Sequence, residues 1–282
     1  MNREAIFSDG TREYIEPWEP NPGDKLKIRI RTERLDQVEV YLCTKKTRIR
    51  VYFEMTRGGF DYYRTTVNLT DEPFSYYFEI RDQNGVCYLD RYGISDEVRL
   101  QYMFTVVPGF SVPDWAKGAV MYQILVDRFC NGDKMNDVAS GEYYYISQRA
   151  RRVLDWNTPP SEFDVGNFYG GDLEGVRQKL YYLKSLGVEV IYFNPLFVSP
   201  SNHKYDIQDY DYIDPHFGKI VYDGGETLKT GDHNNKNATK YIRRVTDKRN
   251  LEASNEFFAK FVEEAHEKGI KVILDGVFNH CG

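Results

Sequence analysis

The chain has 282 residues, which is more than one ordinary domain needs and enough to bury a sizeable core, so we expect two domains. Charged residues make up 28% of the sequence and the formal net charge is −6, with acidic and basic side chains interspersed. The sequence has no long basic run that could neutralise phosphates, which excludes nucleic acid as an expected partner.

The first ten residues contain Arg3, Glu4 and Asp9 where a secretory signal would need an apolar stretch. No later segment is long enough and apolar enough to span a membrane, so we expect a cytoplasmic protein without a membrane partner. The four cysteines lie far apart, without metal-ligand spacing. We therefore expect free thiols.

Residues 25–107 have the periodicity of short β-strands. Apolar residues alternate with polar ones, as in Leu26 to Ile30, Val38 to Leu42 and Tyr76 to Ile80, and turn-forming residues separate the runs. Several antiparallel strands at this spacing favour a β-sandwich. Pro108, Gly109 and Pro113 then interrupt the pattern, which places a domain boundary between residues 112 and 113.

Beyond that boundary, strand and helix patterns alternate. Three nearly continuous apolar runs predict buried strands, and two amphipathic runs predict helices, the first capped by Asp172 and stopped by Gly187. In chain order these are a strand over 119–126, a helix over 172–186, a strand over 188–193, a helix ending near 269 and a strand over 270–274. The order βαβαβ predicts a parallel sheet, either open or closed as a (β/α)8 barrel. Residues 219–250 form a polar insertion that either shapes access to a site or is merely solvated.

Oxygen-bearing side chains follow the first of these strands. Hard oxygen ligands suit calcium, and a glycine carbonyl with one more carboxylate from 170–172 would bring the set to six. The candidate ligands are Asn131, Asp133, Asn136, Asp137, Gly170 and Asp172. On spacing alone, a plain Asx-rich turn is the favoured reading.

The other two strands are also followed by polar residues, as expected for a site at the carboxyl ends of parallel strands. His203, Tyr205 and Asp206 share one loop, while the third strand leads into a carboxylate, an amide and an imidazole. Those last three residues are Asp275, Asn279 and His280. Taken singly, each is ordinary surface chemistry.

Five ordered motifs together resemble the α-amylase family of glycoside hydrolases, in its neopullulanase, cyclomaltodextrinase and maltogenic amylase branch. The segment from Asp275 to His280 looks like that family's Asp-x-x-x-Asn-His signature after strand three. The other motifs are Val112 to Trp115, Tyr122 to Asp133, Gly170 to Leu173 and His203 to Asp206. The strand-rich start is similar, more weakly, to the starch-binding N-terminal module of that branch.

The resemblance implies a β-sandwich over 1–112 and the first part of a (β/α)8 barrel over 113–282. It also implies a structural calcium ion on the six residues above, which reverses the preference for a plain turn. Tyr205 matches the ring that stacks on the sugar being cleaved, and His280 matches the imidazole that hydrogen-bonds it. Asp275 and Asn279 match residues that support the pocket.

The implied activity is retaining hydrolysis of α-glucans such as maltooligosaccharides, cyclodextrin, pullulan or starch, which needs two catalytic carboxyl groups. The resemblance places these groups on strands four and five, and a third aspartate after strand seven, all beyond residue 282. We therefore expect this chain alone to be inactive, and its three-stranded sheet to favour association.

Two other functions remain open on the sequence. The N-terminal domain could act as a non-catalytic glucan-binding module, and the aromatic candidates for stacking on sugar are Trp18, Tyr62, Tyr63 and Tyr92. Core packing explains most of the aromatic content equally well. The branch also implies a possible homodimer through this domain.

Overall fold

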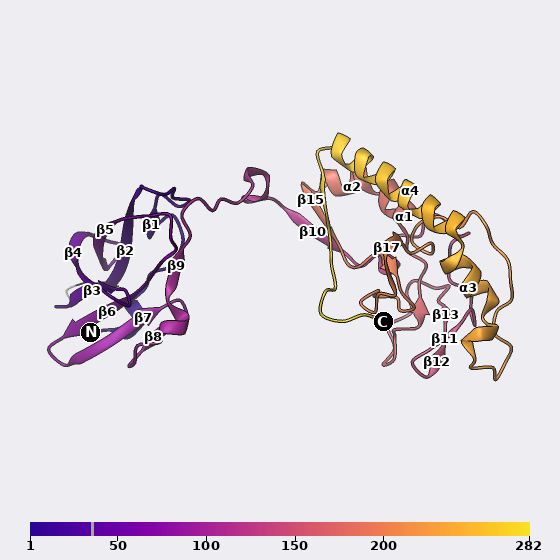
Figure 1. Ribbon diagram of the computed structural model, residues 1–282, viewed down its shortest axis with the longest axis horizontal. Helices are drawn as coiled ribbons and strands as arrows, with labels where there is room; N and C mark the ends of the chain where they lie inside the picture. The colour runs from indigo at the N-terminus through magenta and orange to yellow at the C-terminus, as the bar shows by residue number, and fades with distance from the viewer. Residues whose placement is uncertain (35–36) are drawn as a thin grey trace. The chain divides into compact units, whose positions relative to one another are not determined.

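The computed structural model describes residues 1–34 and 37–282, which form two compact units. The N-terminal unit is Met1–Asp114 and the C-terminal unit is Trp115–Gly282 (Figure 1). Within the described residues, no helix has both the length and the apolar character needed to cross a bilayer. Each unit has its own core and is considered separately.

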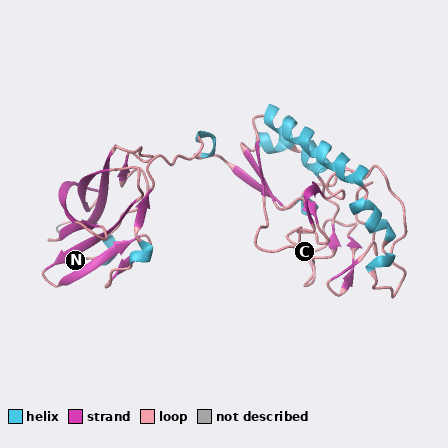
Figure 2. Cartoon of the chain, in the orientation of Figure 1, coloured by secondary structure: helices cyan, strands magenta, loops and turns pink. Residues whose placement is uncertain are grey.

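The N-terminal unit is built from antiparallel strands, apart from two short 3₁₀ turns (Figure 2). The strands run β1 (Ile15–Glu16), β2 (Lys25–Glu33), β3 (Glu39–Cys43), β4 (Arg48–Arg57), β5 (Phe60–Asn68), β6 (Phe74–Asp82), β7 (Gly85–Asp90), β8 (Gly93–Ser95) and β9 (Phe104–Val106). They are hydrogen-bonded in the order β1-β2-β5-β4-β3-β6-β7-β8, with β9 beside β6.

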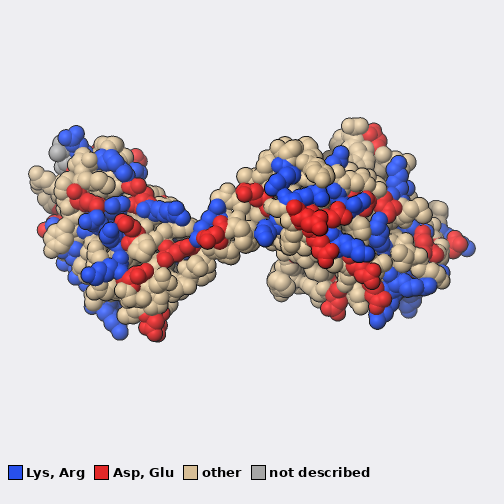
Figure 3. Space-filling view, turned by 90° about the horizontal axis from the view of Figure 1, so that it is seen from above, with Lys and Arg blue, Asp and Glu red and all other residues tan. Residues whose placement is uncertain are grey.

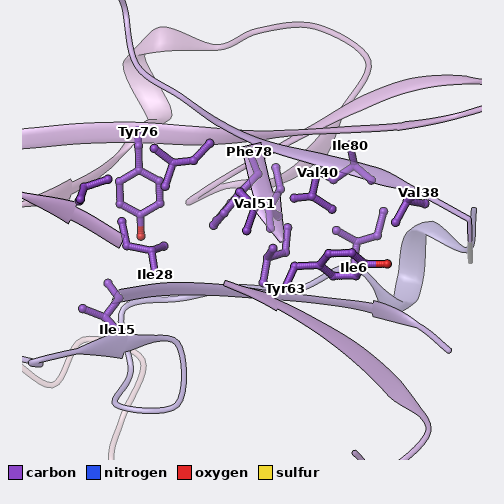
Figure 4. Packing of buried hydrophobic residues seen from close by; sticks show 14 of the residues in the cluster. Ile6, Ile15, Ile28, Val38, Val40, Val51, Tyr63, Tyr76, Phe78 and Ile80 are labelled. Atoms are coloured by element: carbon purple, nitrogen blue, oxygen red, sulfur yellow. The ribbon is translucent and has the colours of Figure 1, made fainter. Parts of the chain in front are cut away.

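Strand β4 belongs to both layers of this unit. Its first half, through Val51, pairs with β3, whereas its second half, from Tyr52, pairs with β5 across a bulge. A strand that changes partners at a bulge makes the corner of two packed sheets. The alternating residues Leu26, Ile28 and Ile30 of β2 are fully buried, and Figure 4 shows Ile28 facing Tyr76 and Phe78 across the core. The predicted sandwich is confirmed.

The C-terminal unit contains a three-stranded parallel sheet, in the order β10-β15-β18, with helices on one face. Its elements are β10 (Met121–Ile124), β11 (Tyr144–Tyr145), β12 (Gln148–Arg149), β13 (Arg151–Arg152), β14 (Asn167–Phe168), α1 (Leu173–Gln178), α2 (Leu180–Ser185), β15 (Val190–Phe193), β16 (Phe197–Val198), β17 (Asp209–Ile213), α3 (Thr239–Thr246), α4 (Lys248–Glu267) and β18 (Lys271–Leu274). The βαβαβ order predicted from the sequence is confirmed.

Helices α1, α2 and α4 lie over one face of this sheet (Figure 1), and their apolar side chains pack against it. Val176, Leu183 and Phe261 are fully buried there against Ile191 and Phe193. Burial of each large apolar side chain stabilises the folded state by about 1.5 to 3 kcal/mol. This layer is therefore the main stabilising contact of the unit.

Three details differ from the sequence-based expectations. The predicted first helix is divided at Lys179 into α1 and α2, although its cap at Asp172 and its stop at Gly187, with φ of +81°, are confirmed. Strand β10 was expected to be buried, but Met121 and Tyr122 are exposed, because its only strand neighbour in the described residues is β15 and the helices cover one face. The polar segment 219–250 includes α3 and the start of α4.

Candidate functional site

A hydrogen bond between two side chains joins the loops that follow β15 and β18. The hydroxyl of Tyr205 donates to Oδ2 of Asp275, with an O···O distance of 2.6 Å. Tyr205 lies in the loop between β16 and β17, and Asp275 directly follows β18. The hydrogen bond to Asp275, together with burial, raises the pKa of the Tyr205 phenol to about 12. The structure therefore joins two of the four predicted substrate-binding residues.

Asn279 and His280 are exposed, and their side chains form no hydrogen bond with another described residue. Their backbone is nevertheless fixed. The hydroxyl of Tyr210 lies 2.5 Å from the carbonyl oxygen of Val277 and 3.0 Å from that of His280, and the N–H of Gly282 donates to Ile207 at 2.8 Å. The segment after β18 is thus held against the loop that carries Tyr205, and the imidazole of His280 has no hydrogen-bond partner among the described residues.

Asp206, beside Tyr205, is an acceptor inside its own loop. Its carboxylate accepts hydrogen bonds from the hydroxyls of Ser199, at 2.5 Å, and of Ser201. Burial alone would raise the pKa of Asp206, but these hydroxyls and that of Tyr145 lower it. An ionised carboxylate held in this way shapes the loop and is a poor proton donor.

Three of the six candidate cation ligands, Asn131, Asp137 and Gly170, lie together. Asn131 donates its amide N–H to Oδ1 of Asp137 at 2.7 Å, and a Cβ on Gly170 would come within 2.6 Å of both side chains. Asn136 donates to the carbonyl of Gly218 at 3.1 Å. The amide oxygens of Asn131 and Asn136 are buried and accept no hydrogen bond, although buried oxygens are normally paired. The donor set therefore fits a hard cation.

All three carboxylates among the candidates already have partners, and Asp137 pairs with the guanidinium of Arg152. The Asp172 carboxylate accepts from the N–H groups of Gly132, Asp133 and Gly175, and its burial raises its pKa to about 6. Asp133 pairs with the ammonium of Lys219 at 2.9 Å. In the described residues, no three His, Cys, Asp or Glu side chains gather as a metal site, so a cation here would depend on amide and carbonyl oxygens.

A buried network of charged residues lies beside this group, and the sequence analysis missed it. His216 lies between two carboxylates, with Nε2 2.9 Å from Glu142 and Nδ1 2.8 Å from Asp214. Arg244 of α3 extends the network from Glu142, and Lys204 extends it from Asp214. Lys204 could have indicated this network from the sequence, because it stands between His203 and Tyr205, which were already considered as parts of a site.

The aromatic candidates of the N-terminal unit separate into two groups. Tyr63 is buried in the core and Tyr62 is buried against Tyr14, with ring centroids 6.5 Å apart, so the expectation that they stack on sugar is wrong. Trp18 and Tyr92 are exposed, at 38% and 74% of their surface. Trp18 also lines a cavity of 220 Å³ together with Phe110.

Both signs of charge are interspersed over the face of the molecule seen in Figure 3. The four cysteines are all free, as expected, with Cys43 and Cys87 buried.

The comparisons with known proteins agree with this geometry. A family model described as the catalytic domain of alpha amylase matches residues 123–235, and one described as the N-terminal Ig-like domain of alpha amylase matches residues 1–108. This chain belongs to the α-amylase family. With that membership, the parallel sheet is the first part of a (β/α)8 barrel that follows an Ig-like β-sandwich.

Similar proteins within the family include a cyclomaltodextrinase from Thermoanaerobacter pseudethanolicus, 32% identical over 100% of this chain and 43% of that protein. Neopullulanase 2 from Thermoactinomyces vulgaris is 32% identical over 100% of this chain and 42% of that protein. Among solved structures, the type III pullulan hydrolase from Thermococcus kodakarensis has a TM-score of 0.52 at 26% identity, over 98% of this chain and 42% of that one. The chain thus spans less than half the length of these relatives.

Proposed function

We propose that this chain is the α-glucan-recognising part of a retaining glycoside hydrolase, and that on its own it binds α-glucan without cleaving it. The hydrogen bond between Tyr205 and Asp275 carries the proposal, because it fixes an aromatic ring at the carboxyl ends of β15 and β18. A ring held in one orientation can stack on a sugar face with little loss of side-chain entropy. The membership in a family of glycoside hydrolases and the names of the relatives support the same ligand class.

The residues of this chain are assigned supporting roles in that reaction. Retaining hydrolysis needs two carboxyl groups about 5 to 5.5 Å apart, one as nucleophile and one as acid and base. Asp206 accepts hydrogen bonds from two serines, and Asp275 accepts one from Tyr205, so both carboxylates already orient other groups. In the proposal, Tyr205 presents its ring face and His280 donates a hydrogen bond to a sugar hydroxyl.

Calorimetric titration with β-cyclodextrin and maltooligosaccharides, with an assay of released reducing sugar, tests this function. We expect binding without release, and we expect Y205A to lose the binding. Y181A is the matched control, because Tyr181 is an exposed tyrosine on α2. Release of reducing sugar would contradict the assignment of supporting roles, and equal loss in both variants would contradict the role of Tyr205.

We also propose that calcium binds between the 131–137 loop and Gly170. The unpaired buried oxygens of Asn131 and Asn136 support this site, with the carboxylate of Asp137 and the carbonyl of Gly170 as further ligands. Bound there, the ion would supply structural cross-linking and no chemistry on the substrate. Asp133, Asp137 and Asp172 would each ligate the ion only by giving up or sharing their present partners.

Thermal unfolding in calcium chloride and in EDTA tests this site. A ligand at a hundredfold excess over its Kd stabilises the folded state by about 2.7 kcal/mol, so we expect a higher Tm with calcium. The N131A variant should lose most of that increase. An identical Tm in both buffers, with wild-type protein, would exclude the site.

A second candidate function is glucan binding by the N-terminal unit, which is favoured by the exposed Trp18 and its cavity. The W18A variant in the same titration separates the two sites. Binding lost in W18A and kept in Y205A would assign recognition to the N-terminal unit.

A further inference from the structure

Lys204, which directly precedes Tyr205, has an unusual backbone conformation. Its φ is +61°, in the left-handed region that side chains other than glycine avoid, because Cβ crowds the following carbonyl. Among the described residues, the other non-glycine positions with positive φ are Ile146 and Ser147. These two form the tight turn between β11 and β12, where such angles are the rule. Lys204 lies in the longer loop between the antiparallel strands β16 and β17 and not in a tight two-residue turn, so its conformation needs another cause.

The side chain of Lys204 supplies that cause. It is 1% exposed, and its ammonium donates to the carbonyl oxygen of Ser199 at 2.7 Å and to Oδ2 of Asp214 at 2.6 Å. The ammonium also lies 4.9 Å from the ring centroid of Phe217. A buried charge is very costly without such partners, so the ammonium is confined to this position. The backbone N–H of Lys204 is held as well, by Oγ of Ser201 at 3.0 Å.

The fixed backbone at residue 204 determines the direction in which the chain continues. The next residue is Tyr205, and its hydroxyl reaches Asp275 across the gap between two loops. If residue 204 relaxed to a negative φ, the chain would leave in another direction and the ring would move away from Asp275.

We propose that Lys204 is a positioning residue, whose buried ammonium holds the strained backbone and thereby places the Tyr205 ring against Asp275. Its importance for sugar recognition rests on the proposed function of Tyr205. The simpler alternative is that Lys204 only stabilises the core through its ion pair with Asp214. The two roles differ in what glycine should do at this position, because glycine adopts positive φ without strain and carries no ammonium.

The experiment uses the full 282-residue chain with ¹³Cζ-labelled tyrosine, studied by NMR at neutral pH. Y205F identifies the Tyr205 signal, and D275A gives the position of that signal without its carboxylate partner. We expect K204M to shift the signal to the D275A position, because the anchor is lost and the backbone can relax. We expect K204G to leave the signal at the wild-type position, even if the variant is less stable.

Every outcome is decisive. The proposal would be overturned if the Tyr205 signal of K204M stayed at the wild-type position, or if it shifted equally in K204M and K204G. A lysine that only stabilises the core predicts one of these two results. If K204M does not fold, K204M/D214N replaces it, since removing both charges leaves no unpaired buried carboxylate. If neither folds, K204G alone decides by keeping or losing the wild-type signal.

Titration of the same variants with maltooligosaccharides separates this proposal from the proposed function. Where wild-type protein binds, K204M should lose affinity to the same extent as Y205A, and K204G should keep it. Where wild-type protein does not bind, the proposed function fails, while the Tyr205 signal still tests the role of Lys204.

Discussion

Gly170 lies where the loop after β10 meets the start of α1, and its environment leaves no room for a side chain. Its φ is +81°, and a Cβ would lie 2.3 Å from Oδ1 of Asp137 and 2.6 Å from Nδ2 of Asn131. The N–H of Gly170 donates to the buried carboxylate of Asp127 at 3.2 Å, which fixes the backbone in this position. A side chain here would therefore strain the backbone and separate the two side chains that the glycine now contacts.

The first prediction compares G170A with G187A. Both glycines have φ of +81°, but nothing lies within 4 Å of a Cβ on Gly187. We expect G187A to lower the free energy of unfolding by about 1 kcal/mol, because alanine is strained in the left-handed backbone conformation. In G170A the new methyl group also overpacks its neighbours, so the loss should reach about 3 kcal/mol. Urea unfolding measures both, and equal losses would show that the neighbours of Gly170 move aside freely.

The buried charge network joins separate segments of the C-terminal unit. Glu142 comes from the loop after β10, Asp214 and His216 follow β17, and Arg244 lies on α3. Arg244 and its bidentate partner Asp223 both belong to the polar insertion, so the pair of Arg244 with Glu142 ties the insertion to the network. The insertion is therefore held against the unit by a buried ion pair, and it is not merely a solvated loop.

The second prediction concerns pH. Burial alone would lower the pKa of His216, but the carboxylates of Glu142 and Asp214 raise it above its ordinary value. The other charged groups of the network are Lys204 and Arg244, whose positive charges act in the opposite direction. A raised pKa means that His216 stabilises the folded state fully below about pH 6.5, and that this contribution is lost as pH rises through the folded-state pKa.

The free energy of unfolding, measured in urea from pH 6 upward, should therefore show a decrease that H216Q removes. H266Q is the control, because His266 is exposed near the end of α4. If H216Q keeps the wild-type pH dependence, the imidazole is not charged in the folded protein.

Local signals explain what the sequence could predict at this scale. The cap at Asp172, the stop at Gly187 and the alternation in β2 depend on neighbouring residues, and all three are present in the structure. The charge network depends on pairs 74 and 102 residues apart, for His216 with Glu142 and for Arg244 with Glu142. No local pattern specifies such pairs, so the sequence left these residues unnoticed. The roles predicted for Asn279 and His280 stay predictions.

For the whole molecule, the main consequence of the fold is an open sheet. Strand β10 is hydrogen-bonded to β15 on one side, and in the described residues no strand pairs with its other side. Met121 and Tyr122 on this strand are 48% and 39% exposed, and Leu274 on β18 is 39% exposed. Unpaired backbone groups beside exposed apolar side chains favour pairing between chains.

The third prediction is a concentration-dependent mass in light scattering, which M121K should reduce because a charge on an edge strand opposes pairing. M135K is the matched control, since Met135 is an exposed methionine of the same unit in a loop. Association that persists in M121K would place the interface elsewhere, as in the homodimer expected through the N-terminal domain. A constant monomer mass at all concentrations would contradict the prediction.

The change of partners within β4 bears on how the N-terminal unit can open. Val51 and Tyr52 are consecutive, yet they pair with strands of different layers. Neither layer can detach or slip by one register step without disrupting hydrogen bonds of the other. Partial opening is therefore disfavoured, and the β4 amides should exchange with deuterium only through unfolding of the entire unit. An Ig-like module built in this way behaves as a single cooperative block.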